Sequence, residues 1–208
     1  MLLQEKAYEI IKKRILTNTY KTGEMLSENG LVEDLGMSRS PIRNALVRLS
    51  KEGFVQIVPQ KGAIVNDMSA EEVRDIFDLR IAVEAHAAQR LPNRLNSKDV
   101  EALQTLLVEQ RKIAEKGNVT DFVTLDFSFH LYLLKKYGNT KMVAILENLR
   151  DRMIQCGIYA ARDQQRMRQT IEEHEAILHA LINGTDSPSA QLLMETHLNN
   201  GKNRFFEQ

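Results

Sequence analysis

Residues 26–65 read LSENGLVEDLGMSRSPIRNALVRLSKEGFVQIVPQKGAIV, and this segment carries the clearest structural pattern in the chain. Ser27 and Ser38 are side chains preferred immediately before a helix, and Gly36 tolerates the left-handed conformation that often follows one. Two short helices with a tight turn between them are therefore predicted. Pro41 agrees with this prediction, because it falls in the first turn of the second helix, where a missing N–H breaks no hydrogen bond.

The second of these helices has one apolar side. Ile42, Leu46 and Leu49 recur at helical spacing and predict a buried stripe. The remaining faces carry the polar residues Arg39, Ser40, Arg43, Asn44 and Arg48. A helix with a buried stripe and an arginine-bearing front end, entered from a short turn, suits a DNA major groove. Surface arginines also occur on protein-interaction modules, so that alternative stays open on pattern alone.

A small β-hairpin is predicted directly after the second helix. Apolar residues within 54–58 precede the turn signal at 59–62, and residues 63–65 return as the second strand. This arrangement places Lys61 and Gly62 at an exposed tip. Such a tip can approach a sugar–phosphate backbone closely.

These residues resemble the winged helix-turn-helix of the GntR family of bacterial transcription regulators. The resemblance rests on Leu26-Ser27-Glu28, on residues 35–46 (LGMSRSPIRNAL), on Leu49, on Glu52-Gly53 and on Lys61-Gly62-Ala63-Ile64-Val65. It implies operator contacts from Arg39 and Arg43 and entry of Gly62 into the minor groove. Relatives usually carry an arginine in the first of the two helices where this chain has Asn29. The resemblance therefore implies at most a weaker, neutral contact from Asn29.

The composition predicts a folded cytoplasmic protein with no membrane partner. The 208 residues suffice for one large or two modest domains. No apolar run is long enough to span a bilayer, and residues 1–16 follow a charged amphipathic pattern unlike a secretory signal. The single cysteine, Cys156, suits a reducing compartment.

The charges balance overall but are unevenly distributed along the chain. Residues 1–66 contain ten Lys or Arg and seven Asp or Glu, whereas the remaining residues contain 18 and 21. A basic head on an acidic body steers the head weakly toward phosphate. We therefore expect a DNA-binding domain at 1–66 and an effector-binding and dimerisation domain at 67–208.

From Ser69 onward the pattern is helical and predicts an antiparallel bundle of six helices, so the fold class is mainly α. Ser69 with Glu72 is a capping box, Pro92 and Gly117 follow helix ends, and Ser187-Pro188 begins the last helix. The expected helices span 69–91, 97–116, 120–137, 139–161, 164–182 and 187–206.

One carboxylate and three histidines fall on the inward faces of these helices. Asp126 and His130 are four residues apart, so they project from one face, one turn apart. His174 and His197 lie among apolar residues of the fifth and sixth helices. Together they offer the ligands that a divalent transition metal prefers. On spacing alone, an Asp–His hydrogen bond and ordinary core histidines stay open as alternatives.

The carboxyl-terminal part resembles the FCD ligand-binding domain of FadR-type GntR regulators, in the shorter six-helix form of VanR-like members. Asp126, His130, His174 and His197 match the metal ligands of that subfamily. The resemblance implies a divalent transition metal, Zn²⁺ first with Ni²⁺ or Mn²⁺ as alternatives, and a small carboxylate effector. Arg80 fits a recurring Arg-x-x-x-Glu run of the subfamily. It could bind the effector carboxylate with two nitrogens, or pair with the glutamate one turn on.

These features predict a homodimeric, ligand-responsive repressor that binds double-stranded operator DNA. A two-fold dimer would read a near-palindromic site and sense a small organic acid at the metal. One alternative is a regulator for which the metal itself is the signal. The other, with less support, is a metal-dependent hydrolase. We expect no enzymatic activity, because no general base accompanies the ligands and an enzyme would leave the amino-terminal domain unexplained.

Overall fold

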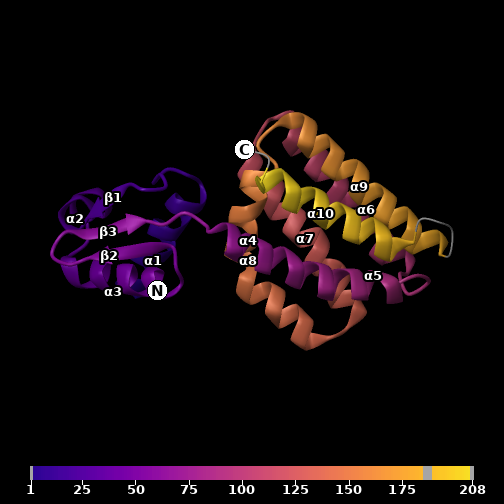
Figure 1. Ribbon diagram of the computed structural model, residues 1–208, viewed down its shortest axis with the longest axis horizontal. Helices are drawn as coiled ribbons and strands as arrows, with labels where there is room; N and C mark the ends of the chain where they lie inside the picture. Colours follow the sequence, from indigo (N-terminus) through magenta and orange to yellow (C-terminus); the bar gives the residue numbers. More distant parts are fainter. Residues whose placement is uncertain (1, 185–188, 207–208) are drawn as a thin grey trace. The chain divides into compact units, whose positions relative to one another are not determined.

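A computed structural model of the chain describes residues 2–184 and 189–206 (Figure 1). The chain divides into two compact units, and the division falls between Met68 and Ser69. The first unit combines helices with a small sheet, and the second is helical. None of the described helices combines the length and the apolarity needed to cross a membrane.

The first unit has the predicted winged helix-turn-helix architecture, with one more strand than the predicted hairpin. Its antiparallel sheet has the order β1-β3-β2, so the extra strand β1 pairs with β3, and Leu26 lies opposite Ala63. The helix α1 packs against α3. The elements are α1 (Leu3–Leu16), β1 (Met25–Ser27), α2 (Glu28–Leu35), α3 (Arg39–Lys51), β2 (Val55–Val58) and β3 (Gly62–Val65).

The local signals around α2 act as predicted, whereas Ser38 precedes α3 without a capping hydrogen bond from its side chain. The backbone N–H of Gly30 donates a hydrogen bond to the Ser27 hydroxyl at 3.0 Å and so caps α2. Gly36 ends that helix with φ 61°, in the left-handed conformation. Ile42, Leu46 and Leu49 are buried in the core of the unit. Burial of this stripe leaves the polar faces of α3 in solvent.

The prediction that Gly62 is exposed at the hairpin tip is wrong, because Gly62 is buried at the start of β3. Gly62 has φ 134°, and a Cβ there would overlap the carbonyl oxygen of Leu26 in β1. Absence of a side chain therefore allows the two strands to approach. Gln60 and Lys61 form the exposed part of the turn instead.

We expect Gly62→Ala to lower the free energy of unfolding of the first unit by about 3 kcal/mol or more, because it combines backbone strain with a backbone clash. Gly23→Ala is the matched control. Gly23 also has a positive φ, 78°, but no described atom lies within 4 Å of its Cβ position. The control should lose only about 1 kcal/mol. Urea unfolding followed by circular dichroism measures both, and equal losses would contradict the packing role of Gly62.

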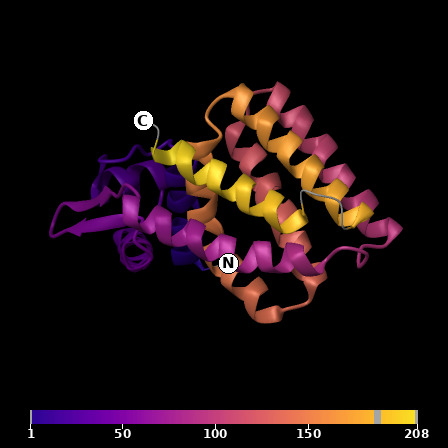
Figure 2. The ribbon, with the colours of Figure 1, turned by 45° about the vertical axis from the view of Figure 1, so that its right-hand side comes forward.

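The second unit is the predicted antiparallel helical bundle, and Figure 2 shows its long helices from a second side. The helix α7 packs between α6 and α8, and α9 packs against both α6 and α10. Phe122 and Phe129 of α7 are completely buried. The helices are α4 (Ala70–Arg80), α5 (His86–Arg90), α6 (Ser97–Glu115), α7 (Val119–Tyr137), α8 (Thr140–Ala160), α9 (Gln164–Asn183) and α10 (Ala190–Phe206).

The helix predicted over 69–91 contains a wider turn that the sequence did not indicate. The π-helical segment η1 (Ile81–Ala85) separates α4 from α5 within one helical run. A π turn inserts extra backbone into the helix and often lies at a functional site. At the other end of the unit, the predicted start of the last helix at Ser187-Pro188 lies outside the described residues.

Candidate functional site

Asp126, His130, His174 and His197 meet inside the second unit. One potential ligand atom from each lies within 4.8 Å of the others. Asp126 and His130 project one turn apart from α7, His174 comes from α9 and His197 from α10. The three imidazoles are buried and the carboxylate is partly exposed.

The distances within this quartet suit a single metal ion. The Nε2 atom of His197 lies 3.1 Å from Nε2 of His130 and 3.4 Å from Nε2 of His174. The Asp126 carboxylate oxygens lie 3.4 Å from Nε2 of His174 and 3.7 Å from Nε2 of His130. Two ligand atoms bound to one zinc ion at about 2.1 Å each lie roughly 3.4 Å apart in a tetrahedral site. The side chains present therefore fit a divalent transition metal.

Each imidazole turns its other nitrogen, Nδ1, toward an acceptor outside the quartet. Such a contact fixes the tautomer and orients the Nε2 lone pair toward a metal. The three pairs are His130 with Oε2 of Glu84 at 2.5 Å, His174 with Oε1 of Gln110 at 3.3 Å, and His197 with Oε2 of Glu173 at 2.6 Å.

The two glutamates in these pairs are held as carboxylates. Burial is the largest influence and alone would raise the pKa of Glu84, but Arg80 and His130 together outweigh burial and the pKa falls to about 2. Burial also opposes ionisation of Glu173, and hydrogen bonds from His197 and Arg166 lower its pKa to about 2. A carboxylate partner makes an imidazole a better electron donor.

Two of the three histidines, His174 and His197, favour the neutral form. Burial lowers the pKa of His174 well below its usual value. Burial also lowers the pKa of His197, although the hydrogen bond to Glu173 acts in the opposite direction. Neutral imidazole is the form that ligates a metal.

Sequence reasoning missed the supporting roles of Glu84, Gln110 and Glu173. Glu84 lies in η1, where the ordinary helical period no longer gives the direction of a side chain. Gln110 contacts its histidine from α6, across a separation of 64 residues. Glu173 directly precedes His174 in the sequence, but its carboxylate contacts His197 of the neighbouring helix. No local pattern marks such pairs.

Two roles were predicted for Arg80, an ion pair with Glu84 and binding of an effector carboxylate, and its contacts are compatible with both. Its Nε donates a hydrogen bond to Oε1 of Glu84 at 2.7 Å, and both side chains are buried. Its Nη2 amine is also buried but has no hydrogen-bond partner among residues 2–184 and 189–206. Arg80 lines a cavity of about 40 Å³ together with Asp126, Arg166, Thr170 and His197. One donor of the guanidinium is therefore unsatisfied beside the quartet.

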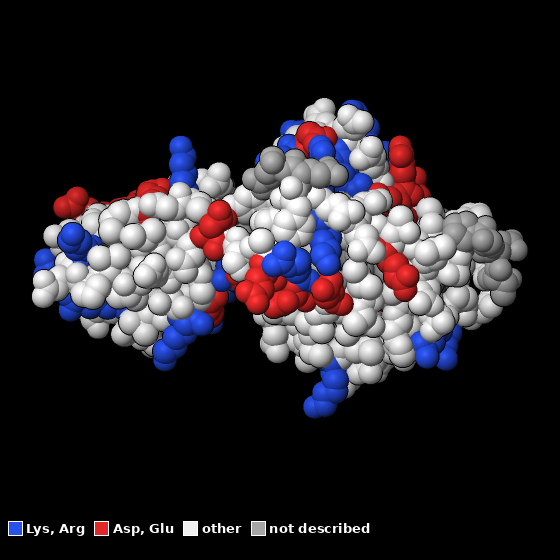
Figure 3. All heavy atoms as spheres, in the orientation of Figure 1, with Lys and Arg blue, Asp and Glu red and all other residues white. Residues whose placement is uncertain are grey.

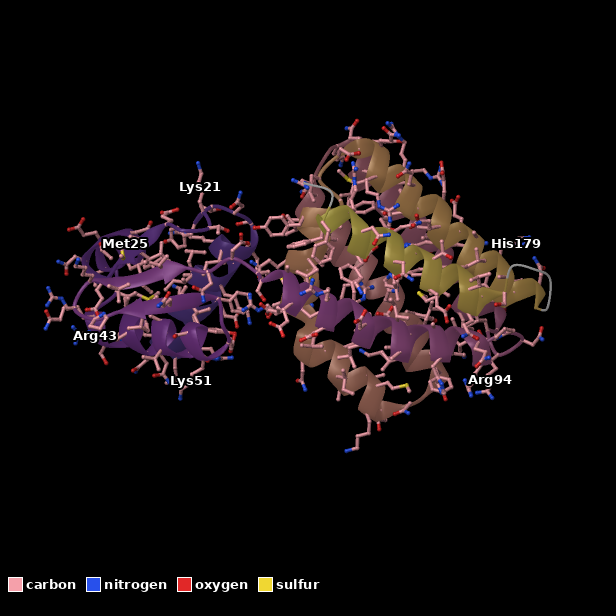
Figure 4. All side chains as sticks on the ribbon, viewed as in Figure 1. Lys21, Met25, Arg43, Lys51, Arg94 and His179 are labelled. Carbon is pink, nitrogen blue, oxygen red and sulfur yellow. The ribbon has the colours of Figure 1, made fainter. Side chains whose placement is uncertain are left out.

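The predicted DNA-contacting side chains of α3 lie on the surface of the first unit. Arg39, Ser40, Arg43, Asn44 and Arg48 are all exposed. Figure 4 shows Arg43 at the outer edge of the unit, and Figure 3 shows Lys and Arg side chains along that margin. Lys61 is also exposed, in the turn between β2 and β3. The geometry therefore leaves these groups accessible to a ligand of opposite charge.

Most of these polar side chains are held by a neighbour rather than extended freely into solvent. Arg48 stacks on the Tyr8 ring, with its guanidinium carbon 3.6 Å from the ring centroid. The hydrogen bonds are from Arg39 Nη2 to Asn29 Oδ1 at 3.0 Å, from Arg43 Nε to both Glu28 oxygens at 2.8 Å, from Asn44 Nδ2 to Gln4 at 3.2 Å, and from Arg48 Nη1 to Glu5 at 3.0 Å. Asn29 thus contacts an arginine of α3.

Comparison with known proteins assigns a family to both units. Residues 3–65 match the bacterial regulatory proteins of the gntR family, and residues 75–200 match the FCD domain. An uncharacterized HTH-type transcriptional regulator of Streptomyces ambofaciens is 31% identical over 194 residues, which cover 92% of this chain and 80% of that protein. The gluconate operon transcriptional repressor of Bacillus licheniformis is 28% identical over 169 residues, covering 81% and 68%.

A solved structure shows the same fold. The Escherichia coli protein McbR/YncC superimposes with a TM-score of 0.77 at 23% identity, over 100% of this chain and 99% of that one. The family and the relatives are transcription regulators and not enzymes, which confirms the expectation that the chain has no enzymatic role. The chain belongs to the GntR family, in which a winged helix-turn-helix is followed by an FCD domain, and it is a DNA-binding transcription regulator.

Proposed function

We propose that the chain is a metal-containing repressor whose affinity for operator DNA changes when a small organic acid binds in the helical unit. The observation that carries this proposal is the convergence of three Nε2 atoms and one carboxylate within 4.8 Å. Each imidazole has an acceptor oxygen within 3.3 Å of its outer nitrogen, an arrangement typical of metal ligands. Asp126, His130, His174 and His197 would hold the ion.

The donor set favours Zn²⁺, with Ni²⁺ and Mn²⁺ as alternatives. On a six-coordinate ion these four residues leave two positions free, or one if Asp126 binds through both oxygens, and a bound metal would supply Lewis-acid binding of a carboxylate oxygen there. The unpartnered Nη2 of Arg80 beside the quartet supplies a donor for the same carboxylate. A ligand that combines a carboxylate with small size therefore suits the site.

A polar groove of about 750 Å³ between α9 and α10 supports access to this site from solvent. Arg166 and His197 line both the groove and the inner cavity. Arg166 is tied to Glu173 by two hydrogen bonds of 2.7 and 2.9 Å. An effector would enter past this ion pair.

In the DNA-binding unit, Arg39 and Arg43 would contact base edges, whereas Lys61 would contact the phosphate backbone. Ser40, Asn44 and Arg48 would add contacts from the same helix. The chain would act as a homodimer in the cytoplasm and read a near-palindromic operator. We propose repression rather than activation of transcription, because one relative is named as a repressor. An effector changes DNA affinity only if it binds one arrangement of the dimer better than the other.

We expect small carboxylates to stabilise the metal-loaded protein. At a hundred times its dissociation constant, a ligand of the native state adds about 2.7 kcal/mol, which raises the melting temperature by roughly 5 °C or more. A thermal-shift screen with acetate, glycolate, malonate and citrate measures this, and acetamide is the uncharged control. Protein stripped with a chelator should show no shift. Equal shifts in melting temperature with and without metal would show that the metal takes no part in effector binding.

The alternative of a metal sensor requires an ion that leaves and returns as its concentration changes. His174 is completely buried, and an acceptor oxygen lies within 3.3 Å of the outer nitrogen of each imidazole, which supports a resident ion instead. DNA binding measured with and without chelator separates the two. If metal removal alone abolishes binding and carboxylates have no effect, the sensor is the better description.

A further inference from the structure

The first residue of α2 contacts the arginine predicted to read DNA from α3. We propose that Glu28 is a positioning residue for DNA recognition, which holds the guanidinium of Arg43 by Nε so that its two terminal amines face a base edge. This inference rests on the contact between Arg43 and DNA in the proposed function. It assigns to the first helix of the helix-turn-helix a role in orienting the second.

The geometry of the pair leaves one side of the arginine available. Nε of Arg43 lies 2.8 Å from each carboxylate oxygen of Glu28. Within the part of the chain that the structure describes, neither terminal amine of Arg43 has a hydrogen-bond partner. The side chain of Arg43 is 59% exposed and that of Glu28 only 22%. The carboxylate is therefore the more buried partner of the pair, and the two terminal amines remain available to a ligand.

The position of Glu28 is itself fixed by two elements. Ser27, the residue before it, caps α2 through its hydroxyl and pairs with Gly62 in the sheet. A negative charge in the first turn of a helix is also favoured by the helix dipole. The backbone that carries Glu28 is thus anchored on both sides, so its carboxylate is a stable support.

A held arginine loses less on binding than a free one. A free arginine side chain has many rotamers, and freezing them opposes association. The contact with Glu28 restricts these rotamers before DNA arrives. It also occupies Nε and leaves the two terminal amines for the O6 and N7 acceptors of a guanine, the commonest specific arginine contact in the major groove.

The next residue of α2 contacts the other predicted base-reading arginine. Asn29 accepts a hydrogen bond from Nη2 of Arg39 at 3.0 Å. Arg39 and Arg43 are one turn apart on α3, so adjacent residues of α2 support adjacent arginines. Asn29 accepts through one oxygen of a neutral amide, whereas Glu28 accepts through two oxygens of a charged carboxylate. Glu28 is therefore the stronger of the two supports.

A competing interpretation predicts the opposite change in DNA affinity when Glu28 is replaced. If Glu28 were only a negative charge near the phosphates, its removal would strengthen binding to any DNA. Glu33 provides the matched control for this effect. It is an exposed acid of the same helix with no hydrogen bond or ion pair to another described residue. Glu33→Gln removes the same charge as Glu28→Gln without touching Arg43.

The experiment uses the full-length protein and two DNA probes. The first, the selected duplex, is obtained from a random-sequence library by binding to the unmodified protein, and the second is a scrambled duplex of equal composition. We expect Glu28→Gln to weaken binding to the selected duplex about tenfold while changing binding to the scrambled duplex by less than about twofold. Glu33→Gln should change both equally. Melting temperatures check that the surface variants fold.

The double variant Glu28→Gln/Arg43→Ala tests whether Glu28 acts through Arg43. It should bind the selected duplex no more weakly than Arg43→Ala alone, because the two residues form one unit. Additive losses, or a gain on both duplexes that equals the gain from Glu33→Gln, would overturn the positioning role while leaving the DNA contact of Arg43 intact. If Arg43→Ala binds the selected duplex like the parent, the DNA contact fails as well.

Discussion

Replacing His174 with alanine is expected to remove the bound metal from the purified protein. The parent should contain about one divalent ion per chain, and the variant close to none, because loss of a buried ligand lowers metal affinity on the order of 100-fold or more. His174 contributes Nε2 to the quartet and is completely buried. Elemental analysis after gel filtration gives the metal content, and competition with a coloured chelator gives the affinity.

A second ligand and a histidine outside the quartet make this result interpretable. The ring of His174 stacks on Phe129 with centroids 4.3 Å apart, so its loss also removes core packing. Asp126→Ala tests the same site at a partly exposed position. His179→Ala is the matched control, since His179 lies on the same helix but is exposed and outside the quartet. Full metal content in both ligand variants, or none in the parent, would exclude the site.

Arg43→Ala is expected to produce the largest loss of DNA binding. An arginine that contacts a guanine with two amines contributes about 1–3 kcal/mol of discrimination, so each half-site should lose about tenfold and a dimer about a hundredfold. The loss should be much greater on the selected duplex than on the scrambled one. Titration of fluorescent duplexes at constant salt measures it, because phosphate contacts vary strongly with salt.

Lys21→Ala is the matched control for this experiment. It removes one positive charge from the same unit, and Figure 4 shows Lys21 on the side of the unit away from Arg43. Its expected effect is less than about twofold, because a distant exposed charge is largely screened. If Lys21→Ala weakens binding as much as Arg43→Ala, net charge rather than the face of α3 would explain recognition.

The sequence predicted those parts of the fold that depend on neighbours along the chain. Ser27 and Gly36 bound a helix through hydrogen bonds and backbone angles within a few residues, and the stripe of α3 follows from its period. The strand β1 escaped prediction because its three residues form a strand only by pairing with β3, far along the chain. The buried position of Gly62 depends on the same pairing.

The candidate metal site likewise contains residues that the sequence predicted and residues that it did not. The residue types of Asp126 and the three histidines, together with the family resemblance, were enough to predict a quartet, and the structure brings the four side chains together. Their partners were not predictable, because Glu84 depends on a π turn and Gln110 reaches across from another helix. The orientation of a ligand is set by contacts that no sequence period encodes.

The carboxylate of Glu173 links α9 to α10 and also contacts His197 of the quartet. It accepts hydrogen bonds from Arg166 on its own helix and from His197 and Asn200 on α10. Docking of α10 and orientation of the His197 ring are therefore linked equilibria. By reciprocity, an ion that favours the docked ring must slow exchange of amide hydrogens in α10, and peeling the helix away must weaken retention of the ion.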